Sequence, residues 1–80
     1  MNDPERDVLR REILKLILEG HNHWTVIEKR SCSLGFGFAT SNTVKRQFYG
    51  YLLQFGYVER IKRGKYALTN KGNRLLDLLS

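Results

Sequence analysis

The feature that most restricts the fold of this chain is a pair of strand-like runs in its last third. Residues 57–61 alternate apolar and polar side chains, as a half-buried strand does, and residues 66–69 have the composition of a returning strand. Between them, residues 62–65 are three cations and one glycine, and glycine allows the backbone of a tight turn. The sequence therefore predicts a β-hairpin with a charged tip.

Two helices are predicted in the first half of the chain. A capping acid and a first-turn proline are followed by apolar side chains at helical spacing that run to Gly20, which predicts a helix over about 4–19. Residues 24–27 fit either a short strand or the start of a second helix. We favour the helix, continuing to about Leu34.

A third helix is predicted after a turn that is longer than usual. Residues 34–39 place two glycines around a phenylalanine, which breaks the periodicity and indicates this turn. Cap candidates at 40–42 then begin a helix over 41–55, and Gly56 ends it. Its predicted core face consists of Val44, Phe48, Tyr51, Leu52 and Phe55.

A last helix is predicted over 71–79, with Thr69 or Asn70 as its cap. Three helices, two strands and a final helix make an α+β fold. Because 80 residues can enclose only one compact core, we assign residues 1–80 to a single domain. The expected apolar face of the last helix consists of Leu75, Leu76, Leu78 and Leu79.

The single cysteine, Cys32, cannot form an internal disulfide, and this favours a reducing compartment. The first residues are mixed in charge and match neither a signal peptide nor a transit peptide. No apolar stretch approaches the roughly 20 residues that a membrane span needs. We expect a soluble cytoplasmic protein with no membrane partner, in which the Cys32 thiol is buried or half-buried.

The positive charge of the chain is concentrated in its carboxyl-terminal half. Residues 41–74 hold eight lysines and arginines against Glu59 alone, whereas residues 1–20 hold four cations and five acidic residues. A concentrated basic surface attracts polyanions, and nucleic acid is the commonest of these for a small cytoplasmic protein. The alternative is a basic face that only keeps the protein in solution.

The order of three helices, a basic hairpin and a final helix resembles the winged helix-turn-helix family of DNA-binding domains. Residues 52–60 are similar to the passage from a recognition helix through a glycine into the first strand of the wing, and residues 66–72 to the second strand turning into the last helix. The resemblance covers nearly the whole chain and includes small stand-alone regulators of prokaryotes and of archaeal plasmids and viruses. The segment 31–39 departs from it, because it is longer than the tight turn of the family.

The resemblance implies a transcription regulator that binds double-stranded DNA sequence-specifically, with a repressor as the preferred interpretation and a homodimer as the expected assembly. The helix 41–55 would lie in the major groove, and the wing 61–66 would contact the backbone or the minor groove. Arg46 is expected to recognise guanine and Asn42 adenine. The candidate DNA-binding residues are Ser41, Asn42, Thr43, Lys45, Arg46, Gln47, Tyr49, Lys62, Arg63 and Lys65.

Two other functions stay open: a winged-helix module that docks on an acidic protein surface, and a binder of nucleic acid without sequence preference. His21 and His23 precede Cys32 in the sequence, but their spacing lacks the paired ligands of a zinc site. Residues 35–37 do not complete a phosphate-loop or dinucleotide fingerprint. We therefore predict no enzyme activity, no cofactor and no metal site.

Overall fold

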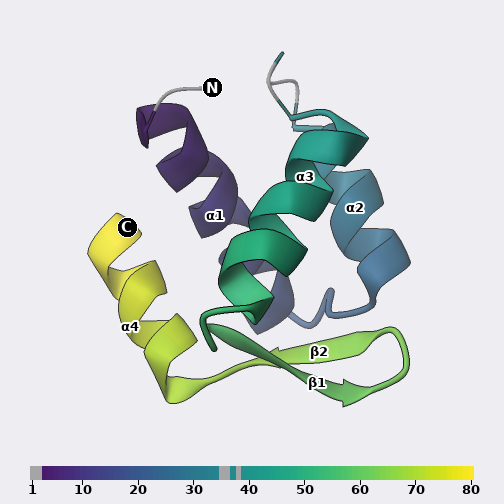
Figure 1. Ribbon diagram of the computed structural model, residues 1–80, viewed down its shortest axis with the longest axis vertical. Coiled ribbons are helices and arrows are strands. Elements are labelled where there is room, and N and C mark those ends of the chain that lie inside the picture. The colour runs from purple at the N-terminus through teal and green to yellow at the C-terminus, as the bar shows by residue number, and fades with distance from the viewer. Residues whose placement is uncertain (1–2, 35–36, 38) are drawn as a thin grey trace.

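The computed structural model describes residues 3–34, 37 and 39–80 (Figure 1). Over these residues the chain forms an α+β fold of four α-helices, one π-helical segment and one two-stranded antiparallel sheet. The helix count differs from the sequence prediction because the third predicted helix is divided into an α-helix and the π-helical segment. The elements are α1 (Asp3–Leu18), α2 (Trp24–Cys32), α3 (Ser41–Gln47), η1 (Phe48–Leu53), β1 (Val58–Lys62), β2 (Lys65–Leu68) and α4 (Asn70–Leu79).

The first three helices pack on one another, and the hairpin closes one end of this group (Figure 1). α4 lies beside α1, and the hairpin tip points away from α4 and reaches past α2 (Figure 1). The Cα radius of gyration is 11.2 Å, close to the value of about 11.6 Å for a compact domain of this length. The buried apolar residues are Leu9, Ile13, Leu14, Ile17, Ile27, Ala39, Val44, Phe48, Leu52, Val58, Tyr66 and Leu76.

Local capping chemistry sets the starts of α3 and α4. Thr40 Oγ1 accepts a hydrogen bond from the Thr43 backbone N–H at 3.3 Å, and Thr69 Oγ1 accepts one from Gly72 N–H at 3.1 Å. Each hydroxyl satisfies a backbone donor that the first helical turn leaves unpaired. Of the two predicted caps of the last helix, Thr69 is the one used. The segment that begins at Trp24 is a helix, as favoured over a strand.

The third predicted helix does not continue as an α-helix to residue 55. The α-helical hydrogen bonds end with Gln47, and residues 48–53 form the π-helical segment. A π-helical turn closes over one more residue than an α-helical turn, so it shifts the angular position of every later side chain. The prediction of a buried Phe55 assumed one continuous α-helix over 41–55. It is therefore wrong at that end of the helix, where the Phe55 side chain is 52% exposed.

The apolar face of the last helix is narrower than predicted. Leu76 is buried, and Leu75 and Leu79 are half-buried. Leu78 is 81% exposed, which corrects its placement in the core. The reason is that α4 contacts the rest of the domain along one stripe, through α1 and β2, and Leu78 lies outside that stripe.

The hairpin is antiparallel and its register is interrupted near the tip. Val58 pairs with Leu68 and Lys62 with Lys65, with the irregularity between Arg60 and Lys62. Gly64 has a φ of +78°, a conformation that glycine adopts without the steric cost of a Cβ. The predicted basic turn is confirmed.

The connection between α1 and α2 pairs with β2, which the sequence did not predict. The Tyr66 N–H donates to the Asn22 carbonyl at 3.0 Å, the Trp24 N–H donates to the Gly64 carbonyl at 2.8 Å, and His23 forms an isolated bridge with Lys65. These contacts hold the hairpin tip against the first turn of α2. The wing-like hairpin is thereby fixed relative to the helices.

The predicted long turn at 34–39 falls largely on residues 35, 36 and 38, which lie outside the described part of the chain. Among the helices that are described, none combines the length and the apolar character required to cross a bilayer.

Candidate functional site

The predicted site residues divide between α3 and the hairpin tip. On α3, the side chains of Asn42, Lys45 and Arg46 are exposed. At the tip, Lys62 and Arg63 are exposed. These five side chains are accessible to solvent.

Three further candidates are engaged in contacts within the domain. The Ser41 hydroxyl donates to Glu28 Oε2 at 3.0 Å, which links the start of α3 to α2. The half-buried Thr43 has its hydroxyl 3.0 Å from that of Thr40. Lys65 is half-buried where β2 pairs with the α1–α2 connection.

Gln47, a predicted DNA-binding residue of the third helix, is buried. Its Oε1 atom accepts a hydrogen bond from Arg10 Nε at 2.8 Å, so the amide faces α1 and not the solvent. The cause is the packing of α3 against α1, which the helical wheel of α3 alone does not contain. Gln47 therefore positions an α1 arginine.

Tyr49 joins the helix to the hairpin. Its side chain is 40% exposed, and its ring centroid lies 4.9 Å from that of Trp24 and 6.5 Å from that of Tyr66 on β2. Burial and a hydrogen bond with Tyr66 raise the pKa of Tyr49 to about 12, with a further increase from Glu28 and an opposing effect from Arg60. Tyr49 is therefore a neutral phenol at physiological pH, packed in an aromatic cluster on one side and open to solvent on the other.

Two arginines of α1 complete a cleft that the sequence did not indicate. Arg6 and Arg10 line it from α1, and Thr43, Arg46 and Gln47 line it from α3. The cleft measures about 470 Å³. The spacing of four places Arg6 and Arg10 on one face of α1, but only the packing of α1 on α3 shows that this face meets Arg46.

The Arg10 side chain of this cleft makes three described contacts within the domain. Its guanidinium carbon lies 3.5 Å from the centroid of the Tyr51 ring, and its Nε donates to Gln47. Its Nη1 is 4.0 Å from Asp7 Oδ1. These three contacts hold one face and one edge of the guanidinium in a fixed orientation.

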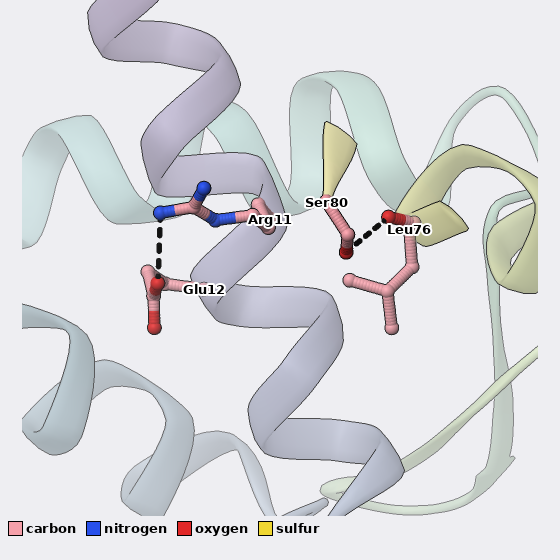
Figure 2. Close-up of polar contacts among 4 residues, drawn as sticks. All are labelled: Arg11, Glu12, Leu76 and Ser80. Carbon is pink, nitrogen blue, oxygen red and sulfur yellow. Dashed lines mark hydrogen bonds and ion pairs between the residues drawn. The ribbon is translucent and has the colours of Figure 1, made fainter. Parts of the chain in front are cut away.

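A second depression lies between α1 and α4 (Figure 2). Arg11 Nη2 and Glu12 Oε1 are 3.3 Å apart on α1, and the Ser80 hydroxyl donates to the Leu76 carbonyl at 2.7 Å at the end of α4 (Figure 2). The depression measures about 440 Å³. Its lining residues are Arg11, Glu12, Lys15, Leu18, Leu76, Asp77 and Ser80.

The Cys32 side chain is exposed, which corrects the expectation of a buried or half-buried thiol. Ser31, one residue earlier, is fully buried, so the side chain of Cys32 lies on the solvent-facing side of the last turn of α2. Within residues 3–34, 37 and 39–80, no three histidine, cysteine, aspartate or glutamate side chains gather as a metal site would require.

Comparisons with protein-family models, with curated proteins and with solved structures gave no match to this chain.

Proposed function

We propose that this protein is a winged helix-turn-helix transcription regulator that binds double-stranded DNA sequence-specifically, with a repressor as the preferred action. The observation that carries the proposal is the pairing of two exposed basic elements on one rigid frame. Lys45 and Arg46 are exposed on α3, and Lys62 and Arg63 at the hairpin tip. The cluster of Tyr49, Trp24, Phe48 and Tyr66 connects the two elements.

In this proposal α3 enters the major groove, and the residues 61–66 form the wing on the backbone or in the minor groove. The planar fork of Arg46 suits the O6 and N7 atoms of guanine, and the amide of Asn42 suits adenine. Arg63, at a turn that Gly64 makes possible, suits the narrow minor groove or a phosphate. The π-helical segment directly after α3 supports the proposal, since such segments recur at functional sites.

The burial of Gln47 changes the proposed contact set. The Gln47 side chain is buried and its Oε1 atom is bonded to Arg10, so it cannot offer a base the paired amide donor and acceptor, and we place Gln47 behind the interface. The remaining contacts are those of Ser41, Asn42, Thr43, Lys45, Arg46, Tyr49, Lys62, Arg63 and Lys65. We assign no catalytic step to this surface, and we place the activity in the cytoplasm because of the single cysteine.

The test is to select bound sequences from a random duplex pool at physiological salt and to measure affinity for the enriched duplex. We expect one enriched motif. Arg46→Gln should weaken binding by about 1–3 kcal/mol and relax the preference at one base pair, because a bidentate base contact is lost. Arg63→Gln should lower the affinity for all duplex sequences by the same factor. It should also reduce the slope of log affinity against log salt by about 1, as the loss of a phosphate contact does.

Arg74→Gln, which removes an exposed charge from α4, is the matched control and should leave both the motif and the salt slope unchanged. Binding without enrichment would replace the proposal by a nonspecific nucleic-acid-binding role. An absence of binding would favour a module that docks on an acidic protein surface.

The proposed assembly is a homodimer formed through the surface of α1 and α4. The depression between these helices holds both signs of charge, with Arg11 and Lys15 opposite in sign to Glu12 and Asp77. A twofold interface brings the same patch of each subunit together, so a patch of mixed sign can be complementary to itself. Two α3 helices would then read half-sites about one helical turn apart, and the enriched motif should be an inverted repeat.

A further inference from the structure

The cleft between α1 and α3 joins three guanidinium groups from two elements. Arg6 and Arg10 come from α1 and Arg46 from α3, and the other two lining residues are Thr43 and Gln47. None of these described lining residues is acidic. The Asp7 carboxylate is 4.0 Å from Arg10 Nη1 and is 55% exposed at its side chain, so water weakens this ion pair.

Arg10 is held in a fixed position before any ligand arrives. Its side chain is only 16% exposed, its guanidinium stacks on the Tyr51 ring, and its Nε is bonded to Gln47. Its Nε–H is used by Gln47 and its Nη1 is 4.0 Å from Asp7 Oδ1, so the donors that remain for another acceptor are those of Nη2 and the second N–H of Nη1. A donor that is already ordered loses less conformational entropy on binding than a mobile side chain does.

The donors of the cleft match a group with several anionic oxygens. A guanidinium forms two parallel hydrogen bonds to a carboxylate or a phosphate. Three guanidinium groups bring three positive charges to the lining of the cleft, more than the single negative charge of a carboxylate can balance. A phosphate group, with three or four outward oxygens and up to two negative charges, fits this arrangement better.

We propose that the cleft between α1 and α3 is a phosphate-binding site, in which Arg10 is the fixed donor and Arg6, Arg46 and Thr43 bind the same group. The phosphate has two possible sources, the backbone of a DNA duplex and a free phosphorylated compound. The volume of about 470 Å³ lies within the range of small-molecule sites, so either source can enter. If the phosphate belongs to DNA, the inference rests on the proposed function. If it belongs to a free compound, the inference stands independently of that function.

A ligand in this cleft would act directly on the proposed DNA surface. Arg46 lines the cleft and is also the proposed guanine-reading residue, and Thr43 is shared in the same way. A free phosphate compound that engages Arg46 withdraws it from the major groove. The cleft would then couple the concentration of that compound to DNA binding by competition.

The experiment follows the arginine Nε–Hε resonances of the folded 80-residue chain by NMR during two separate titrations. The first uses inorganic phosphate at constant ionic strength, with chloride as the reference anion. The second uses a short random-sequence duplex. We expect saturable shifts of the Arg6, Arg10 and Arg46 resonances in at least one titration, and we expect chloride to produce none.

Arg6→Gln and Arg46→Gln should each lower the affinity for the ligand that produces shifts by about tenfold. This is the loss expected when one charged hydrogen-bonding partner is removed. Arg74→Gln on α4 is the matched control and should change the affinity less than twofold. Arg10→Lys keeps the charge but removes the fork, so it should weaken phosphate binding as well. If Arg10→Lys fails to fold, the other two variants decide the outcome.

The outcomes separate this inference from the proposed function. Shifts with inorganic phosphate support a site for a free compound, and shifts with the duplex alone support a backbone-phosphate site. DNA binding that depends on Arg63, while the Arg6 and Arg10 resonances stay unchanged in both titrations, would overturn the inference and leave the proposed function intact. Absence of saturable shifts in both titrations, or equal losses in Arg6→Gln and Arg74→Gln, would also overturn it.

Discussion

At the scale of single residues, Gly72 is a position that only the tertiary contacts explain. It lies in the first turn of α4 and is buried, and a Cβ there would overlap the carbonyl oxygen of Tyr57. That carbonyl also accepts a hydrogen bond from the Thr69 backbone N–H at 3.2 Å. The absent side chain of Gly72 therefore lets α4 start directly against the beginning of β1.

We predict that Gly72→Ala lowers the free energy of unfolding by about 1–3 kcal/mol, because the overlap is with backbone and can be relieved only by moving the helix or the strand. Urea denaturation followed by circular dichroism measures this. Gly50→Ala is the matched control, since a Cβ at Gly50 meets no atom within 4 Å, and it should be neutral or stabilising by up to about 1 kcal/mol. Equal effects of the two changes would contradict the packing explanation.

At the scale of elements, the two threonine caps differ in how much of the fold they connect. Thr69 Oγ1 accepts from the Gly72 N–H and also donates to the Gly56 carbonyl at 2.5 Å, so it links the start of α4 to the turn before β1. Thr40 contacts only Thr43 in the described hydrogen bonds of its hydroxyl, within the first turn of α3. One cap is therefore a tertiary contact and the other is local.

We predict that Thr69→Ala destabilises the domain by about 2 kcal/mol and Thr40→Ala by about 1 kcal/mol, the upper and middle parts of the range for lost caps. Thermal unfolding measured by calorimetry gives both values. Thr69→Ser keeps the hydroxyl and should recover most of the loss. If Thr69→Ala and Thr40→Ala cost the same, the bond to Gly56 adds nothing to the cap.

At the scale of the whole molecule, two strongly exposed apolar side chains lie on different elements of the fold. Leu18 is 60% exposed at the end of α1, in the depression that faces α4, while Ile61 is 58% exposed on the hairpin. The proposed dimer covers the first and leaves the second free. The near-equal exposure of the two side chains makes them a matched pair.

We predict that sedimentation equilibrium gives twice the chain mass of 9.4 kDa at micromolar concentration. Leu18→Gln should weaken the dimer by about tenfold, since burying a leucine side chain contributes about 1.5–3 kcal/mol. Ile61→Gln should leave the association unchanged. A monomer at all concentrations, or equal losses in the two variants, would exclude the α1–α4 surface as the interface.

The sequence by itself determined the elements whose cause is local. The hairpin follows from two strand-like runs around a glycine, the helix caps were narrowed to residues 40–42 and to Thr69 or Asn70, and α1 follows from a continuous apolar stripe. The exposed cations of α3 and of the hairpin tip were also predictable, because charged side chains are rarely buried without a partner. DNA binding and the winged-helix assignment remain predictions.

The tertiary structure decided what depends on packing between elements. It converted the end of the third helix into a π-helical segment, which exposed Phe55, and it turned Gln47 toward Arg10. It also paired the α1–α2 connection with β2 and brought Arg6 and Arg10 beside Arg46. The physical reason is the same in each case: a periodicity fixes which residues share a face, but the neighbour that this face meets is set by how the helices pack.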